Sequence, residues 1–264
     1  MEPDTANEFM PEVEPPRPKS FFTRLGGVYA SPRETFGEIG QAPAVWVPLI
    51  VLLAISLLAG FYLSRTLDLE SMMATQLETA VQQGRITQEQ MDQQLLITSK
   101  LAGVQLIAGA AIGSLLMVFA IAGYGKLFTI FAGAENKFKP LLSVTIFTLL
   151  AVTIIQSALT ILVLQLKGPG DVGLANINSV VASSLGALLT SVLGADALPK
   201  FLISLANAVD VFAIWTIVLL AIGYSAVSKR LKTGTAVFWI VLAYAIIVLI
   251  SAAISSLFGS SGTS

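Results

Sequence analysis

Five long apolar stretches dominate the chain. They run over residues 44–63, 101–124, 141–166, 201–227 and 235–258. A helix of about 20 mostly apolar residues crosses a hydrocarbon core of about 30 Å. Lys or Arg residues stand next to most ends of these stretches and mark where each helix leaves the lipid. The pattern predicts an all-α, polytopic transmembrane helical bundle with about five spans, occupying residues 41–258.

The amino-acid composition excludes several classes of function. Apolar residues make up 55% of the chain and charged residues only 12%, against about 45–50% and 25% in a soluble domain. A net charge of −1 provides no basic field for the phosphates of a nucleic acid. The chain has no Cys and no His, which excludes disulfides, thiolate nucleophiles, Ser-His-Asp triads and the usual zinc sites. We therefore expect a non-enzymatic protein with no catalytic residue, no metal and no cofactor.

The Lys and Arg residues predict the orientation. With the N-terminus inside, five spans place ten of the 15 basic residues on the cytoplasmic side: Arg17, Lys19, Arg24, Arg33, Lys126, Lys137, Lys139, Lys229, Arg230 and Lys232. The external side receives Arg65, Arg85, Lys100, Lys167 and Lys200. This bias is the positive-inside pattern, and it predicts that the C-terminal tail, residues 259–264, is external.

A sixth span through residues 180–193 is the alternative topology. That stretch has only 14 residues and is interrupted by five small or polar residues, Ser183, Ser184, Gly186, Thr190 and Ser191. Counting it as a span would also remove the charge bias. We interpret it as an interfacial or re-entrant segment.

Two segments precede the first span. Residues 1–20 contain five prolines and five acidic residues, which predicts a disordered cytoplasmic tail. Residues 21–40 read as short amphipathic interfacial helices, the second beginning with a capping box at Ser31. The apolar positions of this segment predict a face on the membrane surface, while packing on the protein's own loops is an equal alternative. The face consists of Phe21, Phe22, Leu25, Val28, Tyr29 and Phe36.

The connection between the first two spans predicts an external helical hairpin. A helical stripe of apolar residues runs from Leu69 to Ala80, Gly84 breaks it, and Thr87 with Gln90 forms a second capping box.

Four polar side chains fall in one layer near the outer boundary of the bilayer. Measured along their helices at about 1.5 Å per residue, Gln105, Gln156, Asn207 and Asp210 lie at similar depth. Asp210 is the only ionisable residue within a predicted span. One hypothesis is that the four converge, with Asp210 accepting hydrogen bonds from the amides, because a carboxylate in lipid costs several kcal/mol. The alternative is that Asp210 only caps the fourth span, with residues 201–209 as a separate surface helix.

Several motifs resemble a known family. They are SPRETF at residues 31–36, KPLLSV at 139–144 and VDVFAIW at 209–215, the last followed by Leu219, Leu220 and Gly223. They resemble the bacterial branch of the YIP family of Ypt/Rab-interacting membrane proteins, over most of residues 20–258. The resemblance implies a five-span protein of the bacterial inner membrane. Eukaryotic relatives are associated with small GTPases and vesicle traffic, but no GTPase-binding motif is visible in the tail.

Two functions from different classes remain open. The first is a membrane scaffold that binds other membrane proteins or shapes lipid, in membrane organisation or traffic. The small-residue pairs Ser56/Gly60 and Gly109/Gly113 allow close helix contacts, either inside one chain or with another, so self-association stays open. The second is a small transporter or permease component, although the chain has no evident repeat and an odd number of predicted spans.

Overall fold

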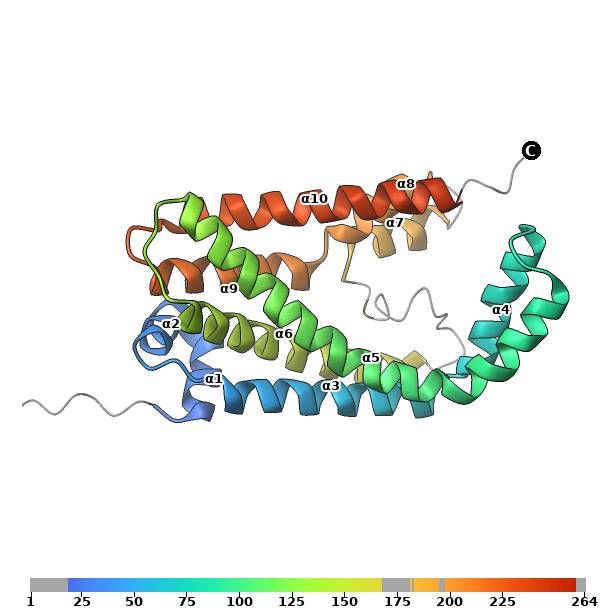
Figure 1. Ribbon diagram of the computed structural model, residues 1–264, viewed down its shortest axis with the longest axis horizontal. Helices are drawn as coiled ribbons and strands as arrows, with labels where there is room; N and C mark the ends of the chain where they lie inside the picture. Colours follow the sequence, from blue (N-terminus) through green and yellow to red (C-terminus); the bar gives the residue numbers. More distant parts are fainter. Residues whose placement is uncertain (1–18, 168–180, 182, 195–197, 260–264) are drawn as a thin grey trace, which may run out of the picture.

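The computed structural model describes residues 19–167, 181, 183–194 and 198–259. Within these ranges the chain forms helices that lie mostly along one common axis (Figure 1). In chain order they are α1 (Phe21–Ala30), α2 (Pro32–Gln41), α3 (Trp46–Thr66), α4 (Leu69–Gln82), α5 (Gln88–Phe131), α6 (Phe138–Lys167), α7 (Leu185–Leu193), α8 (Lys200–Ala208), α9 (Val211–Val227) and α10 (Thr233–Gly259). The predicted all-α membrane bundle is confirmed.

Four of these helices are long and apolar enough to cross a membrane. They are α3, the Leu101–Phe131 part of α5, α6 and α10. Helix α9 is apolar but shorter, with 17 residues, or about 25 Å of helix. Four of the five long apolar stretches in the sequence fall within α3, α5, α6 and α10, apart from the first two residues of the first stretch, and α9 covers the second part of the fourth stretch.

Helix α6 is the centre of the bundle. It packs against α1, α2, α3, α5 and α9. Nearly every residue from 140 to 152 is buried, including three hydroxyl residues, Ser143, Thr145 and Thr148. A helix that is apolar around its whole circumference can be buried on all sides or face lipid, and here the surrounding helices make the first half of α6 the core.

The connections divide between two ends of the bundle. Helices α1 and α2 and the α5–α6 and α9–α10 connections lie at one end, whereas α4, α7 and α8 lie at the other (Figure 1). At the first end the Lys229 amide donates to the Glu135 carbonyl at 3.0 Å, and Asn136 Nδ2 donates to Ser228 Oγ at 3.1 Å. We call this the basic end, because the described Lys and Arg residues predicted as cytoplasmic belong to its elements.

The predicted hairpin between the first two spans is present as α4 and the start of α5. Gly84 has a positive φ of 66°, a conformation that glycine adopts without steric cost. The Thr87–Gln90 capping box forms in both directions. Helix α5 then continues for 44 residues without a break, so the second predicted span is the inner part of one long helix.

The fourth predicted span is not one continuous helix. Helix α8 ends at Ala208 and α9 begins at Val211, with Asp210 between them. The carboxylate binds the first amides of α9, and such a side-chain cap stabilises a new helix start in place of a continuous helix. The separate helix was the sequence-based alternative. Helix α7, with nine residues, is too short to cross a bilayer. The predicted tails up to residue 18 and beyond residue 259 lie outside the described residues.

Candidate functional site

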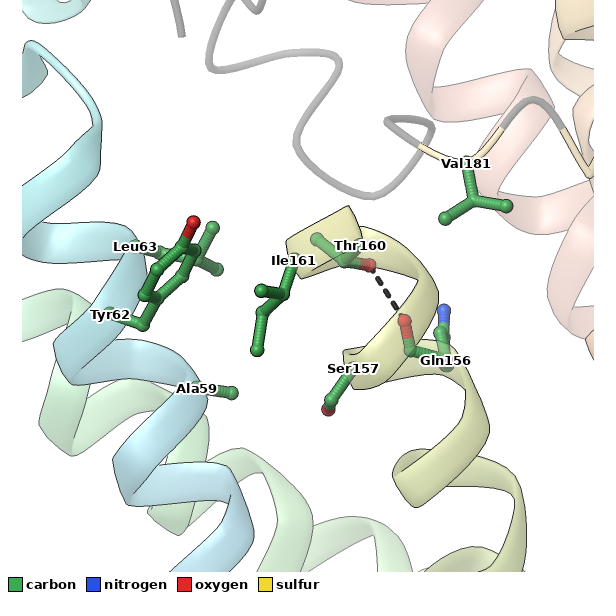
Figure 2. A pocket seen from close by; sticks show the side chains of 8 residues that line it. All are labelled: Ala59, Tyr62, Leu63, Gln156, Ser157, Thr160, Ile161 and Val181. Carbon is green, nitrogen blue, oxygen red and sulfur yellow. Dashed lines mark hydrogen bonds between the residues drawn. The ribbon is translucent and has the colours of Figure 1, made fainter. Parts of the chain in front are cut away.

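A pocket lies between α3 and α6 on the side of the bundle away from α1 and α2. It has a volume of about 210 Å³. Figure 2 shows the α3 side chains of Ala59, Tyr62 and Leu63 across from the α6 residues that line it. The α6 wall is polar, with Gln156, Ser157 and Thr160 beside Ile161, and Val181 completes the lining.

The lining determines what this pocket can bind. Thr160 Oγ1 donates to the backbone carbonyl of Gln156 at 2.8 Å, a bond that does not use the side-chain amide of Gln156. All lining side chains are neutral, so the pocket suits an uncharged group with a hydrogen-bonding atom rather than an ion. None of the described residues that line it is a general base or an activated nucleophile.

Asp210 is held at the junction of α8 and α9. Its Oδ1 accepts hydrogen bonds from the amides of Phe212 and Ala213 at 2.8 and 3.1 Å. Its Oδ2 accepts from the hydroxyl of Ser183. The chain of Ser183 to Leu185 runs antiparallel beside Asp210, with the Leu185 amide donating to the Val209 carbonyl at 2.9 Å. Asp210 is therefore a helix cap that also anchors the segment before α7.

The other residues of this junction reinforce it. Ser184 Oγ donates to Asn207 Oδ1 at 3.0 Å, and Tyr244 of α10 donates to the Ala208 carbonyl at 2.8 Å. We call Ser183, Ser184, Asn207, Asp210 and Tyr244 the α8–α9 junction. Sequence analysis identified Asn207 and Asp210 but missed Ser183, Ser184 and Tyr244. Ser183–Ser184 ahead of an apolar run is an N-cap signal that could have pointed to the segment.

The two glutamines occupy other places. Gln105 lies on the exposed surface of α5, and Gln156 lines the α3–α6 pocket. Among the described residues the hydrogen bonds to Asp210 come from Ser183, Phe212 and Ala213, and neither glutamine is a donor. The structure thus brings Asn207 and Asp210 into one junction. A layer shared by all four residues stays a prediction.

The predicted membrane-surface face divides into buried and exposed members. Val28 and Phe36 have no exposed surface and pack in the core with α6 and α9, so these two side chains contact protein, while the membrane-surface face as a whole stays a prediction. Phe21 and Leu25 are partly buried against the same core. Tyr29 donates to the Ala151 carbonyl at 2.8 Å. Phe22, at 79% exposure, is the member that remains free to contact lipid.

The start of α2 also differs in detail from its prediction. Ser31 is the N-cap and Pro32 is the first residue of the helix, as expected. The Ser31 side chain makes no capping hydrogen bond, so the capping box does not form there.

The two small-residue pairs have different surroundings. A Cβ added at Gly60 would lie 3.0 Å from the Cα of Ile107, and Ser56 Oγ lies 2.8 Å from Ser114 Oγ, so this pair packs against α5. A Cβ added at Gly109 or Gly113 would meet nothing within 4 Å. The second pair therefore presents an open surface of α5.

The described residues contain no group of three or more Asp, Glu, His or Cys side chains that could hold a metal ion.

Comparison with known proteins places the chain among membrane proteins. The model of the Yip1 domain matches residues 26–255. The membrane protein YknW of Bacillus subtilis (strain 168) is 31% identical over 203 residues, which cover 75% of this chain and 76% of YknW. No solved structure matches the chain.

Proposed function

Since the chain belongs to the Yip1 family of membrane proteins, we propose that it is a non-enzymatic scaffold that binds other integral membrane proteins, in membrane organisation or traffic. The binding surface is the exposed side of α5, formed by Gln105, Gly109, Ile112, Gly113 and Leu116. We call it the α5 outer face. These residues recur at helical spacing and all are exposed.

One observation carries this proposal: Gly109 and Gly113 have open space where a neighbouring helix would fit. Small residues four apart let two membrane helices approach closely, and polar side chains such as that of Gln105 form hydrogen bonds between helices. Of the four span helices, α5 and α10 bury the smallest share, 11% of the span against 28% and 33% for α3 and α6. Helix α5 therefore has few fully buried residues, and its outer face is available to a partner.

Photocrosslinking in native membranes tests the proposal. A photoactivatable residue at Leu116 should give adducts with integral membrane proteins, and the double variant Gly109→Leu, Gly113→Leu should lower their yield about tenfold. That factor corresponds to losing about 1.4 kcal/mol of helix contact. An adduct of twice the chain's mass would identify a second copy of the chain as the partner.

The matched control is Gly234→Leu. Gly234 lies in α10, is exposed, and also has open space around it, so the leucine adds the same bulk elsewhere. Adduct yields that stay unchanged in the Gly109, Gly113 variant, or adducts with lipid only, would refute the scaffold proposal.

The second candidate is a small transporter or permease component. In its favour is the broken helix pair α8 and α9, since transporters bind solutes at interrupted helices. Against it, both oxygens of Asp210 already accept hydrogen bonds from the chain itself. Solute flux into liposomes that contain only this protein would favour the transporter.

For the placement in the cell we propose the bacterial inner membrane, with the basic end and the tail of residues 1–20 in the cytoplasm and residues 259–264 outside. The support is the bias of Lys and Arg toward one end of the bundle.

A further inference from the structure

Arg24 is a buried cation that has no counter-ion among the described residues. Its side chain belongs to α1 and the residue is only 4% exposed. Nη1 donates to the Ala42 carbonyl at 2.7 Å, but Nε is buried and has no hydrogen-bond partner. Among the described residues, the ion pairs at this end join Lys19 to Glu34 and Glu38 and do not include Arg24. A buried charge that is not paired is costly, so the site favours an added anion.

Arg24 lines an open depression at the basic end of the bundle. The depression has a volume of about 460 Å³ and is bounded by Lys19, Arg24, Lys139 and the Ala42–Ala44 connection between α2 and α3. Three parts of the chain thus contribute to one basic surface: α1 with the two residues before it, α6, and the α2–α3 connection. We call it the Arg24 depression.

The three basic residues of the depression differ in whether a carboxylate neutralises their charge. Lys19 Nζ lies 2.6 Å from Glu38 Oε1 and 3.5 Å from Glu34 Oε1. The hydrogen bond with Glu38 raises the pKa of Lys19, so Lys19 remains charged at neutral pH with its charge balanced locally. Lys139 is exposed, and no described carboxylate is within ion-pair distance of it. Arg24 and Lys139 therefore provide two positive charges that the described residues do not neutralise.

The Arg24 depression lies where two spans begin. Ala44 stands two residues before α3, and Lys139 opens the apolar run of α6. Ser143 Oγ of α6 donates to the Ala44 carbonyl at 2.7 Å, which holds the two helix starts at one level. Phe22 and Trp46 are 79% and 75% exposed, and exposed aromatic residues of this kind are typical of the membrane interface. In a membrane that α3 and α6 cross, this is the level of the lipid headgroups.

We propose that the Arg24 depression binds the phosphate group of an anionic membrane lipid. A guanidinium donates to phosphate oxygens in a planar fork, and a nearby Lys adds a point charge. A lipid is the source of the phosphate because the depression is at headgroup level and because anionic lipids concentrate in the cytoplasmic leaflet, the side on which the basic end is proposed to lie. The bound phosphate supplies the counter-ion that the described residues do not give Arg24.

Thermal unfolding of the full chain in a mild, uncharged detergent tests this site. Adding dioleoyl-phosphatidylglycerol at about 100 times its dissociation constant should raise the unfolding midpoint by about 5–10 °C, whereas dioleoyl-phosphatidylcholine should not. Lys139→Ala should lose at least half of that rise. The matched control is Lys137→Ala, an exposed Lys two residues earlier that does not line the depression, and it should keep the full rise.

A second variant addresses Arg24 itself. Arg24→Met keeps the length of an unbranched side chain without its charge and should abolish the phosphatidylglycerol response. If this variant does not fold, the comparison of Lys139→Ala with Lys137→Ala tests the proposal without it. Equal responses to the two lipids, or equal losses in the Lys137 and Lys139 variants, would overturn the proposal.

Two further unfolding experiments identify the source of the anion. A full rise with inorganic phosphate alone would assign the site to a soluble anion and overturn the lipid assignment. A phosphatidylglycerol response that appears only after neutralising the tail carboxylates would assign the site to the tail, with the same consequence. The carboxylates to neutralise together are those of Glu2, Asp4, Glu8, Glu12 and Glu14.

Discussion

Single buried hydroxyls connect the helices of the core. Tyr224 of α9 is fully buried, with its hydroxyl 2.8 Å from Thr145 Oγ1 of α6 and donating to the Ile121 carbonyl of α5 at 3.2 Å. The Leu141 carbonyl, 2.9 Å from Thr145 Oγ1, is an alternative acceptor for the single proton of the Thr145 hydroxyl. One phenol therefore links three helices at a point where no water is available to replace it.

Removing this hydroxyl should weaken the bundle. Tyr224→Phe leaves the ring packing intact, so the expected loss is that of one to two hydrogen bonds, about 1–2 kcal/mol. In a chain of this size that lowers the unfolding midpoint by about 2–8 °C in detergent. Thr145→Val should cost a similar amount, and the double variant should cost less than the sum, because both changes remove the same contact. Full additivity would contradict the link.

Asp210 gives a second prediction for a single residue. Asp210→Leu removes the cap of α9 and leaves the Ser183 hydroxyl without its acceptor, so we expect a loss of about 2 kcal/mol. Asp210→Asn keeps one amide-capping oxygen and should lose less than half of that. Thermal unfolding in detergent measures both. Equal stability of the Leu variant and the natural chain would mean that the cap contributes nothing to folding.

Among the elements, α1 and α2 show how a sequence pattern can be read in two ways. Their apolar positions suit either lipid or protein, since both are apolar environments. The structure uses α2 as a packing element: it lies against α9 and α6, and Phe36 and Ile39 have no exposed surface. Only an exposed position such as Phe22 still fits the membrane-surface interpretation.

The two roles predict different costs of substitution. Phe36→Ala should cost about 3–5 kcal/mol, because it opens a cavity in the core. Phe22→Ala, the matched control on α1, should change the stability by less than about 0.5 kcal/mol. Thermal unfolding in detergent compares the two variants, and a large loss for Phe22 would show that it packs on protein.

At the scale of the whole molecule, the basic residues of the described chain lie mainly at one end of the bundle. That separation comes from the connections: α5–α6 and α9–α10 contribute Lys137, Lys229 and Arg230 beside α1 and α2. From this separation the positive-inside rule predicts the direction of the bundle in the membrane.

Reporter fusions test this direction. An enzyme that is active only outside the cytoplasm should give signal when fused after Ser264 and no signal when fused after Lys232, because a single span, α10, separates the two positions. A fusion after Gln83, in the turn between α4 and α5, should also give signal. The opposite result at all three positions would reverse the proposed topology.

The sequence by itself determined the membrane class, the all-helical fold and the existence of the five apolar elements. These follow from hydropathy and length, which act along the chain and need no partner. Local signals were equally informative: Thr87 and Gln90 form the predicted capping box, and Gly84 ends α4, because caps and positive-φ turns involve only residues close in sequence.

Only the tertiary structure decided which apolar surfaces face lipid and which face protein. Since lipid tails and core side chains are alike in polarity, hydropathy could not tell that α6 is central, that Val28 and Phe36 are buried, or that Gly60 packs inside while Gly109 and Gly113 stay open. The same holds for polar groups. Ser183 reaches Asp210, and Lys139 and Arg24 line one depression, through contacts between residues far apart in sequence. Such contacts depend on how the helices pack, which no local pattern records.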